Sequence, residues 1–284
     1  MRVTVGVDSS MVSGRADDTS QVDLPAAWHY NFAMPKNNPA PMPKRPPVSL
    51  FTVPLFLILI ALAWTLIVPA PMPEALQALQ SDSSVAVSTE GWLVFQPVGD
   101  TPEAGLVIYP GARVKAQSYA PVARALAEQG TLAVIVPMPL NLAILGSGRA
   151  VQAIEAFPQV TRWAVGGHSL GGAMAASVAR KRPDLIDGLV LWAAYPGSAD
   201  NLSSSTMPIV SIYGTRDGLT TPDKIEASRS LLPASARFVA IAGGNHAQFG
   251  WYGSQWGDGP ADIGREEQMR QVVASTLELL QELP

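Results

Sequence analysis

The segment TRWAVGGHSLGGAMAASVARKRP, residues 161–183, joins a short apolar run to a helix-forming run through a turn with four glycines around one serine. This pattern predicts a strand-to-helix connection. Gly167, Ser169 and Gly171 form a G-x-S-x-G motif, in which the glycines answer the steric demand of a tight turn. Ser169 is then expected to expose its hydroxyl beside the positive end of the following helix. A glycine-rich turn without a catalytic role is the alternative.

Strand and helix patterns alternate through residues 85–284. Strands are expected at 84–88, 92–96, 105–110, 131–138, 161–167, 187–194, 207–214 and 236–244, and helices at 118–130, 148–158, 171–183, 221–232 and 264–283. This alternation predicts an α/β fold with a mostly parallel sheet and helices on both faces. Ligands bind such sheets at the carboxyl ends of the strands, so residues directly after strands are the candidate functional residues.

Composition excludes several classes of function. The chain of 284 residues is 48% hydrophobic and 15% charged, which suits one or two folded domains. Its net charge of −4 disfavours a nucleic-acid partner. It has no cysteine, so thiol catalysis, disulfides and thiolate metal sites are excluded. Its three histidines have no spacing typical of a zinc site, and no metal is expected.

A serine hydroxyl needs a base before it becomes a nucleophile, and elimination selects His246. His29 lies before a long apolar segment, and the side chain of His168 should diverge from that of its neighbour Ser169. His246 directly follows the strand expected at 236–244. Its imidazole needs a carboxylate, and Asp217 follows the preceding strand. The order nucleophile, acid, base is that of α/β-fold hydrolases.

An acyl-transfer site also needs hydrogen-bond donors for the oxyanion. The amide of Leu170, directly after the nucleophile, is one candidate. The second should come from the loop after the strand at 105–110, where Ala112 is the first choice and Arg113 the second. A simple strand-to-helix loop is the alternative interpretation of that stretch.

Two rim loops, 137–146 and 249–259, are the candidates for substrate specificity. Arg113, Met138, Phe249 and Trp251 are possible pocket residues, with Tyr252 and Trp256 nearby. The aromatic residues of the second loop equally suit a packing role between the last helix and the sheet.

The N-terminal third divides into three segments. Residues 1–47 are polar and proline-rich and are expected to be disordered, and starts at Met34 or Met42 would leave the first part untranslated. Residues 48–69 hold an uncharged run long enough for a transmembrane signal anchor. Residues 70–84 are expected to be a linker. A cleaved signal peptide, giving a secreted protein, and a buried core helix are the alternatives for the apolar run.

Basic residues set the expected orientation of that anchor. Lys36, Lys44 and Arg45 precede it, and the next basic residue is Arg113. The positive flank stays in the cytoplasm, so the N-terminus is expected inside and the domain of residues 85–284 outside the cell membrane.

Four motifs, GLVIYPGARV, GGHSLGG, SIYGTRDG and GGNHAQFG, give residues 85–284 a resemblance to the α/β-hydrolase superfamily. More narrowly, the chain resembles a compact bacterial branch related to dienelactone-hydrolase-like enzymes. The resemblance implies a serine hydrolase with Ser169 as nucleophile, Asp217 as acid and His246 as base. The oxyanion loop departs from the family, with Tyr-Pro-Gly where many members have His-Gly. Dienelactone hydrolases proper use cysteine, so their substrate is not carried over.

The sequence therefore predicts a serine hydrolase of carboxylic esters, thioesters or amides that needs no cofactor. Only a short connection separates the strands at 187–194 and 207–214, so no large lid is expected. Two alternatives remain open. The first is a non-catalytic, membrane-anchored binding protein that keeps the fold. The second is an acyltransferase that uses the same three residues.

Overall fold

A computed structural model describes residues 52–284 of the chain. Eight strands form one sheet in the order β1-β2-β4-β3-β5-β6-β7-β8. The strands are β1 (Val85–Ser88), β2 (Leu93–Pro97), β3 (Ala104–Tyr109), β4 (Leu132–Ile135), β5 (Arg162–His168), β6 (Gly188–Trp192), β7 (Ile209–Gly214) and β8 (Arg237–Ile241). The first two pair as an antiparallel hairpin, β2 also pairs antiparallel with β4, and every later neighbouring pair is parallel. The predicted mostly parallel sheet is confirmed.

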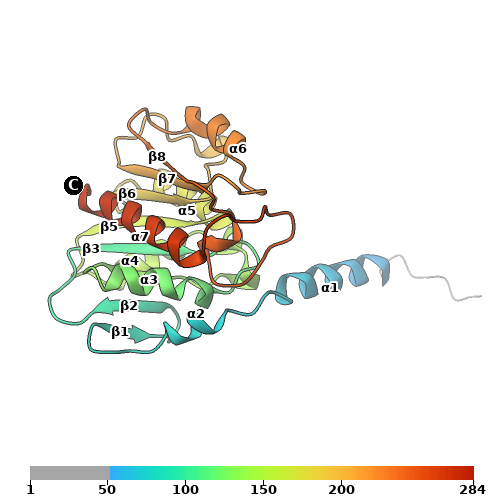
Figure 1. Cartoon of the computed structure of the whole chain (residues 1–284), viewed down its shortest axis with the longest axis horizontal. Helices are drawn as coiled ribbons and strands as arrows, with labels where there is room; N and C mark the ends of the chain where they lie inside the picture. Colours follow the sequence, from blue (N-terminus) through green and yellow to red (C-terminus); the bar gives the residue numbers. More distant parts are fainter. Residues whose placement is uncertain (1–51) are drawn as a thin grey trace, which may run out of the picture. The chain divides into compact units, whose positions relative to one another are not determined.

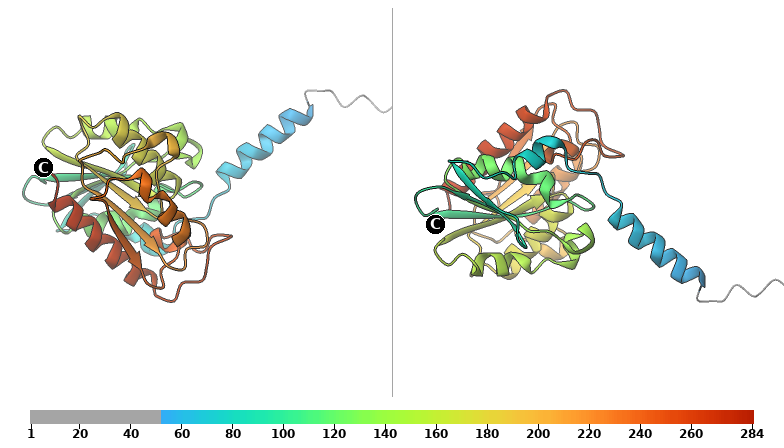
Figure 2. Two further views of the ribbon diagram at one scale, coloured as in Figure 1. Left: turned by 90° about the horizontal axis from the view of Figure 1, so that it is seen from above. Right: turned by 90° about the horizontal axis from the view of Figure 1, so that it is seen from below.

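Helices cover both faces of this sheet (Figures 1 and 2). On one face α3 (Ala120–Ala127) and α7 (Arg265–Gln281) bury apolar side chains with Phe95, Ile108 and Trp192. On the other, α4 (Arg149–Glu155) and α5 (Leu170–Lys181) pack with Val107 and Val165. A further helix, α6 (Pro222–Ser228), lies between β7 and β8 in the chain. Consecutive strand residues are buried because both sides of a parallel sheet meet helices.

The connection between β6 and β7 is short, as expected. Between Trp192 and Ile209 it contains one 3-10 helix, η4 (Ser198–Asp200). No helical lid is therefore inserted at this point of the described chain.

The predicted transmembrane segment at 48–69 is not supported. It contributes helix α1 (Thr52–Leu66), of 15 residues. Among residues 52–284, no helix is both long and apolar enough to cross a membrane. The predicted disordered segment 1–47 and the first four residues of the predicted anchor, 48–51, lie outside the described residues.

The expected linker at 70–84 contains a short helix, α2 (Pro73–Gln77), that packs onto the domain. Ala75 is fully buried and Ala78 belongs to the core that α3 and α7 share. Arg124 of α3 reinforces this contact by donating to the carbonyl of Ala78 and to the carboxylate of Asp82. The packed domain thus begins with α2, before residue 85.

A glycine at position 171 permits the close contact between α5 and the end of β3. A Cβ there would lie 2.2 Å from the carbonyl oxygen of Tyr109 and 2.4 Å from that of Pro110. Gly171→Ala is expected to lower the free energy of unfolding by about 2 kcal/mol or more, because backbone must move to admit the methyl group. Urea denaturation measures the change.

Gly197→Ala is the matched control, since its Cβ would meet nothing closer than Asp200 at 4.0 Å. Its midpoint should stay near that of the unmodified chain. Equal midpoints for both variants would contradict the steric interpretation of Gly171.

Candidate functional site

Ser169 occupies the turn between β5 and α5 in a backbone conformation that residues other than glycine rarely adopt. Its φ is 54° and its ψ is −124°. Such a conformation costs free energy and persists only where the surroundings impose it. Here the backbone packs closely on both sides of Ser169. A Cβ added at Gly167 would lie 2.6 Å from the carbonyl oxygen of Tyr109 and 2.7 Å from the carbonyl carbon of Gly171. The half-buried Ser169 therefore sits at the first turn of α5 on a strained, tightly packed turn.

Asp217 and His246 come together beyond the ends of β7 and β8. Asp217 Oδ2 lies 2.8 Å from His246 Nδ1, and both side chains are buried. The other carboxylate oxygen of Asp217 accepts the amides of Leu219, at 2.8 Å, and Thr220, at 2.6 Å. A carboxylate only accepts, so Nδ1 carries the proton and Nε2 is left as the basic nitrogen.

Asp258 holds the loop that carries His246. Its carboxylate accepts the amides of His246 at 3.2 Å, Ala247 at 2.8 Å and Gly218 at 3.1 Å. It thereby ties the loop after β8 to the loop after β7, which carries Asp217. Sequence reasoning missed this residue, because its role depends on a contact across 40 positions of the chain.

The ring of His168 links the serine turn to His246. The centroids of the His168 and His246 rings lie 4.4 Å apart, and Phe249 stacks on the His168 ring at 5.6 Å and 15°. The predicted divergence of His168 from Ser169 is compatible with this contact, since His168 points into the core and is buried. The serine turn and the Asp217–His246 pair are thus parts of one packed cluster.

Tyr119 joins this cluster to the loop after β3. It lies in η1 (Ala116–Tyr119), and its hydroxyl accepts the amide of Gly111 at 2.9 Å. Its single proton is then available for His168 Nδ1, also at 2.9 Å. A Cβ at Gly111 would lie 2.8 Å from that nitrogen, so glycine is required here. Sequence reasoning did not single out Tyr119, which looked like an ordinary core residue of a helix.

Two of the three amides in the loop at residues 111–113 donate hydrogen bonds within the fold, and one of these two is Arg113, the second-choice oxyanion donor. Gly111 donates to Tyr119, and Arg113, with a φ of 59°, donates its amide to the carbonyl of Asn141 at 2.8 Å. Within residues 52–284, no hydrogen bond engages the amide of Ala112. The amide of Leu170 opens α5, where backbone donors have no partner within the helix.

A cavity of about 140 Å³ lies beside this loop. It is lined by Pro69, Ala112, Arg113, Val114, Tyr252, Ser254, Gln255 and Trp256. Of the predicted pocket residues, Arg113 lines it. Met138 and Phe249 belong to the two core clusters, and Trp251 is buried with the Arg265 guanidinium 5.8 Å from its ring. Tyr252 and Trp256 also line the cavity, and Tyr252 belongs at the same time to the core that α3 and α7 share.

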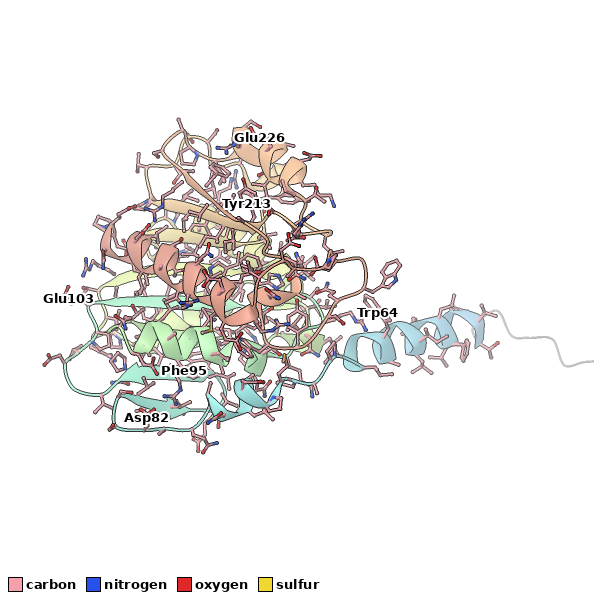
Figure 3. The ribbon with its side chains drawn as sticks, viewed as in Figure 1. Trp64, Asp82, Phe95, Glu103, Tyr213 and Glu226 are labelled. Atoms are coloured by element: carbon pink, nitrogen blue, oxygen red, sulfur yellow. The ribbon has the colours of Figure 1, made fainter. Side chains whose placement is uncertain are left out.

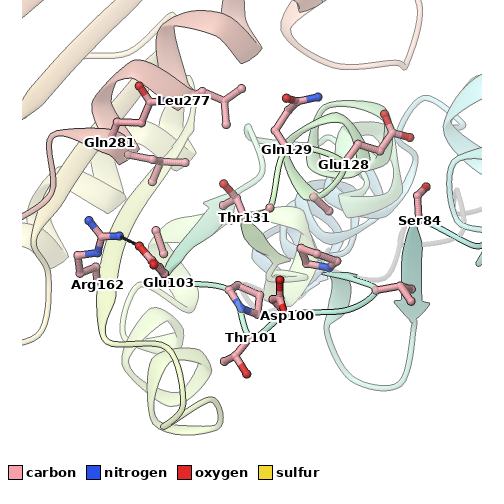
Figure 4. Close-up of a pocket in the computed structure, with 17 residues that line it drawn as sticks. Ser84, Asp100, Thr101, Glu103, Glu128, Gln129, Thr131, Arg162, Leu277 and Gln281 are labelled. Carbon is pink, nitrogen blue, oxygen red and sulfur yellow. Dashed lines mark hydrogen bonds and ion pairs between the residues drawn. The ribbon is translucent and has the colours of Figure 1, made fainter.

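A cavity of about 580 Å³ lies at the other end of the sheet (Figure 4). Its lining includes Ala104 and Arg162, which begin β3 and β5, and Thr131, just before β4. Arg162 pairs there with Glu103 at 2.6 Å. Because ligands of parallel sheets bind at the carboxyl ends of strands, this cavity is not the candidate active site. Within residues 52–284, no cluster of three or more histidine and carboxylate side chains is placed to hold a metal ion.

Burial and the neighbouring His246 hold the pKa of His168 well below its usual value. The folded protein therefore keeps this imidazole neutral while the unfolded chain binds a proton below about pH 6.5. Stability contributed by neutral His168 is lost as the pH falls through that value. Between about pH 7.5 and about pH 5.5, this one group should lower the free energy of unfolding by about 1 kcal/mol.

Urea denaturation of the unmodified chain and of His168→Asn at both pH values measures this loss. Asparagine keeps an acceptor for Tyr119 but does not titrate, so the difference in stability between the two proteins should change with pH. Parallel pH profiles would contradict a neutral His168.

The sequence of the chain matches a known protein family, and its fold matches solved structures. A model of the alpha/beta hydrolase family matches residues 105–270, more than half of the chain. No curated protein sequence matches. Among solved structures, dienelactone hydrolase from Anabaena variabilis has a TM-score of 0.54 and 17% identity, covering 72% of this chain and 99% of its own.

Est1E from Butyrivibrio proteoclasticus has a TM-score of 0.50 and 14% identity, covering 70% of this chain and 100% of its own. A second Est1E structure holds ferulic acid and has a TM-score of 0.53 and 13% identity, covering 72% and 98%. At these identities the structures share the fold alone, whereas the family model matches the sequence itself. The chain therefore belongs to the alpha/beta hydrolase family.

Proposed function

We propose that the protein is a serine hydrolase that cleaves carboxylic esters, thioesters or amides through an acyl-enzyme on Ser169. The observation that carries this proposal is the buried Asp217–His246 pair, whose imidazole packs on His168, the residue before the strained Ser169. Under this proposal Ser169 is the nucleophile, His246 is the base and Asp217 is the group that orients the base.

In the proposed mechanism, Ser169 Oγ attacks the carbonyl carbon while His246 Nε2 takes the hydroxyl proton. The resulting imidazolium is stabilised by Asp217, whose oxygen already accepts from Nδ1. His246 then gives the proton to the leaving oxygen, sulfur or nitrogen, and the carbonyl–heteroatom bond breaks. Water attacks the acyl-enzyme in the same way and regenerates Ser169.

The amides of Ala112 and Leu170 are the proposed oxyanion donors. The neighbouring amides of Gly111 and Arg113 are engaged by Tyr119 and Asn141, which leaves Ala112 as the donor in that loop. Leu170 adds the N-terminal end of α5, where the helix dipole favours negative charge.

A small-molecule ester is the proposed substrate class. Est1E, which shares the fold, has been solved with ferulic acid bound. The short connection between β6 and β7 leaves the described site without a helical lid, so the loops around Ala112 and Trp256 shape its entrance.

Ser169→Ala should abolish labelling by a fluorophosphonate probe and lower ester hydrolysis by about a thousandfold or more. The probe reacts with a serine that its site has already activated, so the loss reports an assembled nucleophile. Gel fluorescence and release of p-nitrophenol from p-nitrophenyl acetate measure the two effects.

Ser203→Ala is the control, because Ser203 is exposed in the loop between β6 and β7. It should label and hydrolyse like the unmodified chain. Folded protein that takes up no probe would favour the non-catalytic binding protein instead.

The proposed location is the cell membrane, with residues before 48 in the cytoplasm and the domain outside. The support comes from sequence: Lys36, Lys44 and Arg45 precede an apolar run, and no charged residue follows until Glu74. Protease added to intact cells should then degrade the domain while a cytoplasmic marker survives. A domain cleaved only after lysis would overturn this orientation.

A further inference from the structure

Exposed apolar side chains gather at one edge of the described structure. Fourteen large apolar side chains are exposed among those that the structure describes. Nine lie in α1 or directly after it, between Val53 and Ile67. Three more are Ile144, Leu145 and Trp256, the last of which is 96% exposed. The two remaining, Leu76 and Val98, lie elsewhere.

Three kinds of contact place this apolar edge beside the proposed active site. Helix α1 touches η2 (Pro139–Asn141), which follows β4 and leads into η3 (Ala143–Leu145) with its exposed Ile144 and Leu145. The small cavity beside Ala112 is lined by both Pro69, just after α1, and Trp256. The loops that carry η3 and Trp256 follow the carboxyl ends of β4 and β8, just as Ser169 follows β5.

The third contact is made by Arg113, the neighbour of Ala112. Its guanidinium donates to the carbonyls of Trp64 and Ile67, both at 3.0 Å, and lies 3.8 Å from the ring centroid of Trp64, near the end of α1 (Figure 3). Positive charge at the C-terminal end of a helix is favourable. The apolar helix is thus bonded to the loop that carries the proposed oxyanion donor.

Apolar side chains surround α1 on every side, and this distribution favours a lipid environment over a protein groove. Residues 55–60 are six consecutive apolar positions, each 49–64% exposed, so they occupy every side of the helix. A protein groove covers one stripe of an amphipathic helix. Hydrocarbon covers all sides, and a helix that is apolar all round suits it. The basic residues Lys36, Lys44 and Arg45 before the run add attraction to anionic lipid headgroups.

We propose that α1, Ile144, Leu145 and Trp256 together form a lipid-docking face, through which the entrance to Ser169 opens onto a bilayer. The substrates would then be esters that reside in the membrane and reach Ser169 without crossing water. The substrate part of this inference rests on the proposed hydrolase function, whereas the docking part does not.

Introduced cysteines test the docking part, because the natural chain has none and each new thiol is a single labelling site. The full chain carrying Ile144→Cys or Trp256→Cys is labelled with an environment-sensitive fluorophore and mixed with vesicles of phosphatidylcholine and phosphatidylglycerol in equal amounts. A quencher attached to the lipid acyl chains should dim both labels. The Val98→Cys control should stay bright.

Bright labels at positions 144 and 256 on vesicle-bound protein would overturn the inference, since α1 would then act as a tether alone. A full chain that fails to float with vesicles would overturn it as well. Neither readout requires catalysis.

The substrate part is tested by placing charge on α1. Leu57→Glu combined with Ile60→Glu should weaken vesicle binding about 100-fold or more, because carboxylates are costly in hydrocarbon. Hydrolysis of p-nitrophenyl palmitate in vesicles should fall in parallel, while hydrolysis of dissolved p-nitrophenyl acetate stays unchanged. The matched control, Leu76→Glu combined with Val98→Glu, adds the same charge outside the face and should change neither binding nor hydrolysis.

The outcomes separate the two proposals. Loss of vesicle binding without loss of palmitate hydrolysis would overturn membrane-resident substrates. Fluorophosphonate labelling of Ser169 with quenched labels at 144 and 256 supports both proposals. Quenched labels without any labelling of Ser169 would support docking and overturn the hydrolase function.

Discussion

The contact between the first turn of α5 and the end of β3 is the constraint on which the site depends. Gly171 lies against the carbonyls of Tyr109 and Pro110, and those two residues lead directly into the Gly111–Arg113 loop. Contact between backbone atoms therefore fixes the distance between the serine turn and the loop that carries the proposed oxyanion donor. Ser169 keeps its strained φ because the packing of Gly171 against the end of β3 fixes the turn.

A chain of buried polar groups extends that constraint to His246, the proposed base. Tyr119 takes the amide of Gly111 and gives its proton to His168, whose ring packs on His246. Burial and the neighbouring His246 lower the pKa of His168 and keep its imidazole neutral, whereas the ring of His246 faces the carboxylate of Asp217. Two imidazoles in contact can thus have different roles, because a carboxylate faces one and a phenol faces the other.

Local patterns were sufficient to predict most of the fold. Each expected strand and helix of residues 85–284 is present, because apolar periodicity and glycine or proline boundaries are local properties. Asp217 and His246 could be selected because strand ends meet at one edge. Asp258, Tyr119 and α2 could not, since their roles arise from contacts between distant segments. Met138 and Phe249, predicted to line a pocket, also pack in the two core clusters, and a local pattern carries no sign of how an apolar side chain near a site divides between the two roles.

The apolar edge and the buried Asp217–His246 pair are physically compatible. Asp217 and His246 are 3% and 1% exposed, so the groups that bear charge are already removed from solvent by the fold. An apolar surface at the entrance therefore adds little further desolvation cost to them. The proposed ester-contacting residues are half-buried and uncharged, namely Ser169, Leu170 and Ala112. Their contact with an ester therefore requires no charged group at the surface. A water-poor entrance would also strengthen the oxyanion's hydrogen bonds, because electrostatic interactions gain as the local dielectric falls.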